Sequence, residues 1–182
     1  MQDSGLWVFG YGSLIWEPAF DFAERTTARL AGWHRSFCMR SVQYRGTPDA
    51  PGLVLALDAA PGAVCHGVAF GITAEHADTA LDALRKRELN TSAYIERWLP
   101  LELADERRVE AVTYVIDPRH DQYCGGMSLE DQARIIARST GDRGANCDYL
   151  WNTAAHLAEL GFADADLEWL SDRVRHLMAS AS

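Results

Sequence analysis

The sequence predicts a protein of the α+β class, and three observations carry this prediction. Short apolar runs bounded by glycine and proline dominate residues 6–116, as is typical of strands. Segments with apolar residues at helical spacing follow residue 128. Strands therefore come mostly before helices along the chain, whereas a doubly wound parallel sheet would alternate them.

The first two-thirds of the chain contain the predicted strands and one helix. Strands are expected over residues 6–9, 28–41, 53–57, 63–72, 94–103 and 108–116. Glycine and proline predict a loop over 45–52, and the polar stretches 58–62 and 104–107 are expected turns. Thr73 is suited to cap a helix that starts at residue 74 and ends at about residue 88 or 89.

The last third contains three predicted helices with clear start or stop signals. Ser128 is the expected cap of a helix over 129–140, which Gly141 ends. A second helix is expected over 147–160, and a third follows Asp164. The apolar stripe of the third helix consists of Leu167, Leu170, Val174 and Leu177.

Composition narrows the possible functions. The chain has 182 residues, of which 48% are hydrophobic and 24% charged, and this predicts one folded domain over 1–182. The formal net charge of −9 disfavours binding to nucleic acid and to anionic membranes. The polar start, residues 1–5, does not resemble a signal peptide, and no apolar run reaches the length of a membrane span. We therefore expect a cytoplasmic protein; the sequence does not indicate its oligomeric state.

Glu88 is the first candidate for chemistry, because it continues the apolar stripe of the helix over 74–88. The apolar positions before it, at spacings of three and four, are Ala77, Leu81 and Leu84. Burial and the negative end of the helix are expected to raise the pKa of Glu88, and Arg85 would lower it. Such a carboxylate suits a general base near neutral pH. The alternative is a solvated side chain, or one paired with Arg85.

A glycine-containing segment after the first strand is the second candidate. Gly10 and Gly12 would let the backbone approach a ligand closely and point N–H groups at it. Ile15 stands where a dinucleotide-binding fingerprint has its third glycine, and no helical pattern follows. The alternative is a tight turn in which Ser13 makes a structural hydrogen bond.

Metal ligands and nucleophiles have no local signature in this chain. The six histidines and four cysteines lack zinc-ligand spacing, and the four cysteines are expected to be reduced: Cys38, Cys65, Cys124 and Cys147. No metal is therefore expected. Three arginines close in sequence, Arg35, Arg40 and Arg45, could supply positive potential to an anionic ligand, or lie singly on the surface.

Four segments together resemble the ChaC family of γ-glutamylcyclotransferases, over nearly the whole chain. They are residues 8–16 (VFGYGSLIW), residues 45–48 with 51–52, the Arg87-Glu88 pair followed by Tyr94, and residues 144–150. The link between Glu88 and Tyr94, residues 89–93, is longer than in many family members and lacks glycine.

This resemblance implies a γ-glutamylcyclotransferase-like fold, with a small mixed, barrel-like sheet and packed helices. It implies a small-molecule substrate, glutathione, cleaved to 5-oxoproline and Cys-Gly without a metal or organic cofactor. Glu88 matches the proton-transferring glutamate of the family. The substrate-binding residues implied are Val8, Phe9, Gly10, Tyr11, Gly12, Ser13, Leu14, Arg45, Tyr94 and Tyr149.

The implied reaction needs no protein nucleophile, because the α-amine of the γ-glutamyl group attacks its own γ-carbonyl. Glu88 is the candidate for both proton transfers. The N–H groups of residues 10–13 could stabilise the oxyanion, or the hydroxyls of Tyr11 and Ser13 could hold the substrate α-carboxylate. Two other functions stay open: a cyclotransferase for another γ-glutamyl peptide or amine, and a non-catalytic module that binds a γ-glutamyl metabolite.

Overall fold

The computed structural model describes residues 4–182; residues 1–3, which belong to the polar start discussed above, lie outside the described residues. The chain folds into two compact units, each assembled from two separate segments. Unit 1 contains residues 4–35 and 56–121, and unit 2 contains residues 36–55 and 122–182. That these units act as one domain over 1–182 stays a prediction.

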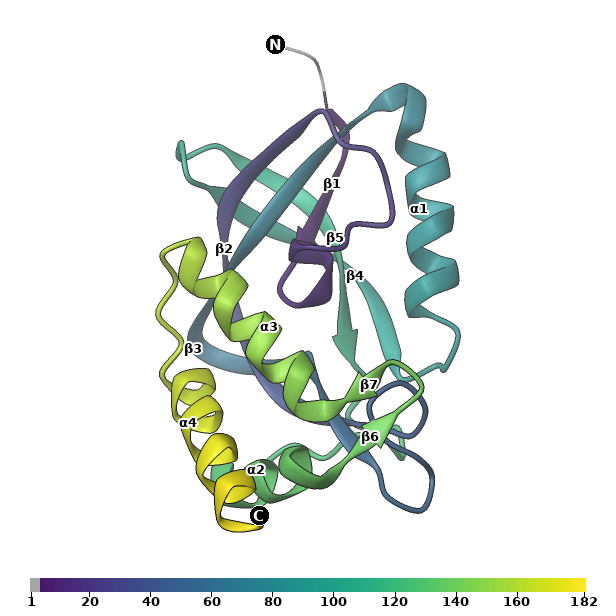
Figure 1. The fold of residues 1–182 in the computed structure, drawn as a ribbon. Coiled ribbons are helices and arrows are strands. Elements are labelled where there is room, and N and C mark those ends of the chain that lie inside the picture. Colours follow the sequence, from purple (N-terminus) through teal and green to yellow (C-terminus); the bar gives the residue numbers. More distant parts are fainter. Residues whose placement is uncertain (1–3) are drawn as a thin grey trace. The chain divides into compact units, whose positions relative to one another are not determined.

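Five strands form a closed barrel (Figure 1). They follow one another in the order β1-β3-β2-β4-β5. Their bounds are β1 (Ser4–Gly10), β2 (Glu24–Ser41), β3 (Gly52–Thr73), β4 (Tyr94–Leu103) and β5 (Arg108–Ile116). β1–β3, β2–β4 and β4–β5 pair in antiparallel fashion, whereas β5 is parallel to β1 and to β3. The predicted α+β class and mixed, barrel-like sheet are confirmed.

Alternation along the strands builds the core of unit 1. Trp7, Phe9 and Tyr11 are spaced by two residues, so they point to the same side of the sheet and share one apolar cluster. The other strands of unit 1 add buried residues to this cluster, among them Leu30, Leu57, Leu101, Leu103 and Val115. The end of β1 is therefore packed in the apolar core of unit 1.

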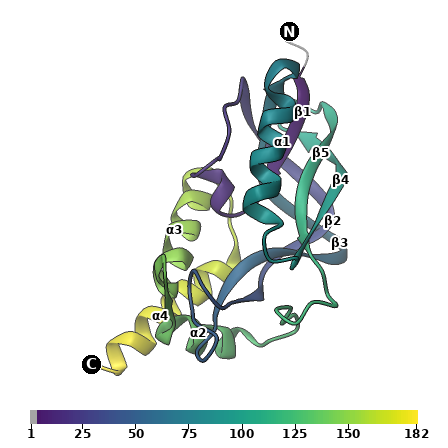
Figure 2. The ribbon, with the colours of Figure 1, turned by 90° about the vertical axis from the view of Figure 1, so that its right-hand side faces the viewer.

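The helix α1 (Ala74–Glu88) follows β3 and has the predicted bounds. It lies beside β1, as Figure 2 shows, and it buries Ala80 and Leu84. Thr73 stands at the predicted cap position, but its hydroxyl lies 3.0 Å from Nδ1 of His76 and makes no capping bond to the backbone.

The predicted turn over residues 58–62 is wrong, because β3 runs without interruption from Gly52 to Thr73. Gly62 adopts φ +86° within this strand. A glycine with positive φ inside a strand is typical of a bulge, which bends a strand without ending it. The proline and glycine of this stretch therefore mark a bend in one long strand.

Unit 2 contains three helices that pack on one another (Figure 1). They are α2 (Leu129–Arg138), α3 (Asn146–Glu159) and α4 (Ala165–Ser180). The side chains of Ser128 and Asp164 cap α2 and α4, as expected for Ser and Asp before a helix. No helix within residues 4–182 has the length and apolar character needed to cross a membrane.

The predicted extension of the first of these helices to residue 140 is wrong. Thr140–Gly141 forms a short strand, β6, which pairs with β7 (Gly144–Ala145). A side chain at Gly141 would lie 2.4 Å from the carbonyl oxygen of Gln43, so another backbone segment already fills the place of a Cβ atom. This close approach favours the extended hairpin over another helical turn.

Candidate active site

Glu88 is the last residue of α1, and its side chain is 17% exposed. Burial raises the pKa of this carboxyl group, and the positive charge of Arg87 opposes the rise. The negative end of α1 disfavours the charged form further. The predicted raised pKa is therefore confirmed in direction. The prediction that Arg85 lowers this pKa is wrong, because the charge that lowers it belongs to Arg87.

Arg85 binds elsewhere, and this removes it from Glu88. Its Nε and Nη2 atoms each donate to Glu96 of β4 at 2.9 Å. The Tyr114 hydroxyl of β5 donates to the same carboxylate at 3.0 Å. The Arg85 hydrogen bond lowers the pKa of Glu96 despite partial burial. Burial is the main cause that raises the pKa of Tyr114, and the charges of Glu96 and Glu88 raise it further, so this phenol stays protonated close to the candidate base.

The segment after β1 turns sharply at Gly12 into the short 3-10 helix η1 (Ser13–Ile15). The Tyr11 hydroxyl donates to the carbonyl of Tyr114 at 2.8 Å. A substrate carboxylate would therefore have to compete with this carbonyl for the Tyr11 proton. The Ser13 hydroxyl accepts a hydrogen bond from Nη2 of Arg87 at 2.9 Å, so the expected structural bond of Ser13 exists and connects it to the helix that carries Glu88.

Arg35 fixes the peptide between Tyr11 and Gly12. Its guanidinium is buried, and its Nε donates to the carbonyl of Tyr11 at 2.7 Å and its Nη2 to the carbonyl of His66. In a trans peptide the N–H points opposite to the C=O, so the N–H of Gly12 points away from Arg35. Arg35 lies in unit 1, whereas Arg40 and Arg45 belong to unit 2.

Three residues of the predicted binding segment are core residues. Val8, Phe9 and Leu14 are buried, and Val8 and Phe9 are completely inaccessible. The Thr113 hydroxyl donates to the carbonyl of Phe9 at 3.1 Å, which fixes the end of β1 further. Only the backbone of these residues is therefore suited to contact a substrate.

Tyr94 begins β4 opposite Ile116 of β5 and is half-buried. The link that precedes it contains no glycine, yet Ser92 adopts φ +60°. This left-handed conformation is one that glycine takes readily. Ser92 therefore makes the turn in this link without a glycine.

The other two predicted binding residues meet in unit 2. The guanidinium of Arg45 lies 5.6 Å from the centre of the Tyr149 ring, and its Nη1 donates to the carbonyl of Ala145 at 3.2 Å. The Tyr149 hydroxyl accepts from the N–H of Leu55 at 3.2 Å. The structure thus brings together two side chains about 100 positions apart in sequence.

Asn146 is a residue that sequence reasoning missed. Its amide is fully buried, and it accepts from the N–H of Leu53 and donates to the C=O of Leu53, both at 2.8 Å. It therefore pairs with β3 as a neighbouring strand would. The available signal was its place inside the segment 144–150, which resembles the ChaC family.

Cysteines and metal ligands show no clustering in the described part of the chain. No group of three His, Cys, Asp or Glu side chains among residues 4–182 could hold a metal ion. Cys38, Cys65 and Cys147 are buried, as is typical of structural thiols. A reaction without metal or cofactor stays a prediction.

Comparison with known proteins identifies the family. The ChaC-like protein family matches residues 6–177. The chain belongs to the ChaC family. It is 40% identical over 178 residues to the glutathione-specific gamma-glutamylcyclotransferase of Escherichia coli (strain K12), covering 98% of this chain and 76% of that protein. It is 36% identical over 184 residues to gamma-glutamylcyclotransferase 2-3 of Arabidopsis thaliana, covering 97% and 92%.

A solved structure of the same kind confirms the predicted ChaC fold. The chain matches the crystal structure of the γ-glutamylcyclotransferase specific to glutathione from yeast with a TM-score of 0.86 at 24% identity. The match covers 96% of this chain and 97% of that one. The four sequence segments that suggested the ChaC family therefore belong to a chain of which 96% matches this fold.

Proposed function

We propose that this chain is a glutathione-specific γ-glutamylcyclotransferase, which converts glutathione into 5-oxoproline and Cys-Gly. One observation carries the mechanism: a largely buried carboxylate, Glu88, stands at the end of α1 and is joined through Arg87 to the loop after β1. Membership of the ChaC family and the names of its curated relatives support glutathione as the substrate.

Glu88 acts first as a base. It takes a proton from the α-ammonium group of the γ-glutamyl moiety, and the resulting amine attacks the γ-carbonyl carbon of the same residue. In water a glutamate and an α-amino group differ by about 3.5 pK units, or roughly 5 kcal/mol. Because burial raises the pKa of Glu88, this gap is smaller in the protein. The ring C–N bond forms as the proton moves to the carboxylate.

The tetrahedral intermediate then collapses. The bond between the γ-carbon and the cysteine nitrogen breaks, and Glu88 returns its proton to the departing amine. The ring nitrogen then loses its second proton, which Glu88 passes to the same amine. The products are 5-oxoproline with a neutral lactam N–H and Cys-Gly with an ammonium group, and Glu88 is regenerated as a carboxylate. Both protons that leave the attacking nitrogen end on the departing nitrogen, so one residue can carry them.

The backbone of the loop after β1 is proposed to stabilise the oxyanion. Arg35 holds the Tyr11 carbonyl, so the orientation of the Gly12 N–H is fixed before the substrate arrives. A donor fixed in this way is typically worth about 3 kcal/mol in the transition state. Within unit 1, we assign substrate binding to the backbone of residues 8–14 and to the side chain of Tyr94. That Arg45 and Tyr149 bind the substrate stays a prediction from the family resemblance.

Release of 5-oxoproline from a set of related compounds tests this function. Glutathione is expected to react. N-acetylglutathione should be inert because it has no free α-amine, and α-linked Glu-Cys-Gly should be inert because its amide cannot close the five-membered ring. Equal turnover of either analogue would indicate a peptidase that uses water. Binding of glutathione without turnover would indicate the non-catalytic module, and preference for a γ-glutamylamine would change the substrate. The proposal includes a cytoplasmic location, which cell fractionation tests.

A further inference from the structure

Arg87 contacts the candidate base Glu88 and two groups of the loop after β1. Its Nη2 donates to the Ser13 hydroxyl at 2.9 Å, and its Nη1 donates to the carbonyl of Glu17 at 2.7 Å. Its Nε lies 3.4 Å from Oε1 of Glu88. The Arg87 side chain is 24% exposed, so solvent screens these contacts only in part. One planar group thus connects the end of α1 to Ser13 at the start of η1 and to Glu17, two residues beyond its end.

The bond to Ser13 determines which way its hydroxyl can act. A guanidinium carries only donors, so the Ser13 oxygen must accept from Arg87. The hydroxyl proton is then directed to a different acceptor. A carboxylate or a developing oxyanion of a substrate is such an acceptor, and a hydrogen bond to a charged acceptor is stronger than a neutral one.

The contact with Glu88 has an electrostatic consequence. Among the described residues, Tyr114 on β5 interacts with the charge of Glu88, and it shares the carboxylate of Glu96 on β4 with Arg85 on α1. Arg85 and Tyr114 both bind Glu96, whereas Arg87 alone lowers the pKa that burial raises at Glu88. Arg87 therefore keeps part of the carboxylate population available as a base.

We propose that Arg87 is a positioning residue of the cyclisation: it holds the loop of Ser13 at a fixed distance from Glu88 and presents the Ser13 hydroxyl as a donor to an anionic group of the substrate. This inference rests on the proposed function. A purely structural clamp would have the same contacts, but its loss would change stability and leave the pH profile and KM unaltered.

Two substitutions separate the two effects. Arg87→Gln removes both the charge and the fork of donors. Arg87→Lys keeps the charge but reaches one acceptor at a time, because an ammonium group lacks the planar fork. Lys86→Gln is the matched control, since Lys86 is exposed on the same turn and its loss changes the net charge by the same amount.

We expect Arg87→Gln to lower kcat/KM for glutathione by about a hundredfold, since a small misplacement of reacting groups has effects of this size. The acidic limb of its pH profile should move to higher pH. Glu88 acts as a base only when deprotonated, and loss of the Arg87 charge raises its pKa further. Arg87→Lys should lose about tenfold, mostly through a higher KM, with the limb close to that of the parent. Lys86→Gln should match the parent. Combining Ser13→Ala with Arg87→Gln should add little to Arg87→Gln alone.

Two measurements do not depend on turnover. Carbon-13 NMR titration of the Glu88 carboxyl should show a higher pKa in Arg87→Gln than in the parent. Hydrogen exchange of the amides of residues 10–17 should be faster in both Arg87 variants. A parent protein without activity on glutathione would refute the proposed function, and these two measurements would still decide the role of Arg87. Activity of folded Arg87→Gln within twofold of the parent, an unmoved pH limb, or an unchanged Glu88 pKa would each overturn the inference. If Arg87→Gln fails to fold, the inference would be overturned by a folded Arg87→Lys variant that has the same KM as the parent.

Discussion

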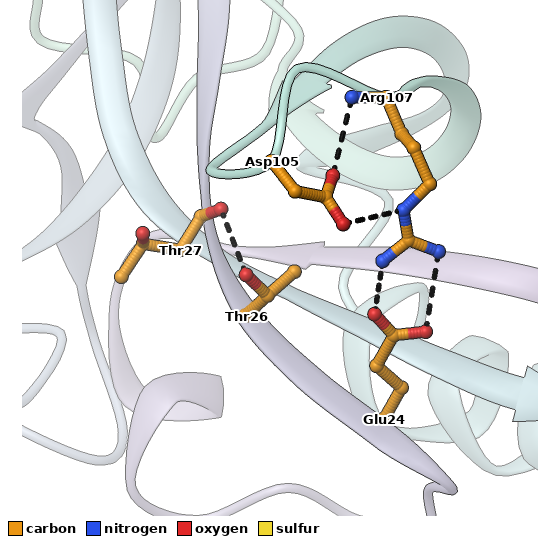
Figure 3. Close-up of polar contacts among 5 residues, drawn as sticks. All are labelled: Glu24, Thr26, Thr27, Asp105 and Arg107. Carbon is orange, nitrogen blue, oxygen red and sulfur yellow. Dashed lines mark hydrogen bonds and ion pairs between the residues drawn. The ribbon is translucent and has the colours of Figure 1, made fainter.

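Two arginines in unit 1 form ion pairs with carboxylates, but only Arg87 lies beside the candidate base. Arg107, after the turn between β4 and β5, binds Glu24 at the start of β2 and also Asp105 in its own turn (Figure 3). Its guanidinium lies 5.5 Å from the centre of the Trp7 ring. Glu24 is 37% and Asp105 55% exposed, whereas Glu88 beside Arg87 is 17% exposed.

The difference in exposure reverses the effect on the carboxylate. Hydrogen bonds from Arg107, first from its backbone N–H and then from its side chain, lower the pKa of Asp105. At Glu88 the arginine opposes burial and does not overcome it, so the pKa is raised. An arginine beside a carboxylate therefore accompanies a lowered pKa at the exposed Asp105 and a raised pKa at the largely buried Glu88.

The strongest test removes the base. Glu88→Gln preserves shape and hydrogen bonding but cannot accept the ammonium proton, so 5-oxoproline release should fall by about a hundredfold to ten-thousandfold. Steady-state kinetics with glutathione measures this. Turnover within a few-fold of the parent would show that burial of this carboxylate has no catalytic purpose and that the comparison fails.

The same variant should be at least as stable as the parent at neutral pH. A carboxylate whose pKa is raised by folding stabilises the folded state below its unfolded pKa, and this stabilisation is lost as pH rises through the folded pKa. Glutamine removes that loss. Thermal melting should therefore show a gain at pH 7 that disappears near pH 4, and a fall in Tm at pH 7 would contradict the burial argument.

A smaller effect is expected from the ion pair that holds the last turn of α1. Glu96→Gln removes the charge that binds Arg85 and Tyr114, so Glu88 should be positioned less firmly and kcat/KM should fall by about tenfold. Glu102→Gln is the control, because Glu102 lies on the same strand and binds Arg29 at the surface. Equal effects of the two changes would mean that distance from Glu88 does not matter.

Removing the exposed ion pairs of Arg107 with Glu24 and Asp105 should have a still smaller effect. Arg107→Gln should leave kcat/KM within twofold and lower Tm by at most a few degrees, because an exposed ion pair is weak. The Tm difference should shrink in 1 M salt, where the screening length is about 3 Å. A large loss of activity in this variant would show that the two arginines are functionally alike.

No effect at all is expected from a chelator. If burial is what makes Glu88 reactive, treatment with EDTA followed by gel filtration should leave 5-oxoproline release unchanged. If activity is lost and a divalent metal restores it, the reaction depends on a bound metal ion and not on the burial of Glu88 alone.

Local pattern predicted most elements of this fold. The bounds of α1, β4 and β5 follow from helical spacing, from runs of β-branched and aromatic residues, and from a polar turn between them. The bend at 58–62 was mistaken for a turn because proline and glycine mark both, and only pairing with other strands distinguishes them. The hairpin of β6 and β7 depends on Gly141 meeting a backbone segment about 100 positions earlier, which no local window contains.

The surroundings of the candidate site were predicted where they depend on one helix and missed where they depend on contacts distant in sequence. The burial of Glu88 was predicted because helical periodicity directs its side chain inward. The partner of Arg85 was not, because Glu96 comes from the next strand and competes with Glu88 for the same guanidinium. The sequence gives no sign that Tyr114 binds Glu96, because it lies in an apolar strand where an aromatic residue is expected in the core. Arg45 and Tyr149 came from family resemblance alone, since nothing in their spacing relates them.

The order in which the chain is synthesised matters because each unit is assembled from two separate segments. A ribosome finishes unit 1 when residue 121 has emerged. Residues 36–55 must then wait for residues 122–182, whose synthesis takes at least about three seconds at rates of about 5–20 residues per second. During that interval Leu53 and Leu55, both buried in the finished protein, lack Asn146 and Tyr149 to cover their backbone. The nascent chain is thus most exposed to misfolding and to chaperones late in its synthesis, and neither unit can be excised as one continuous piece.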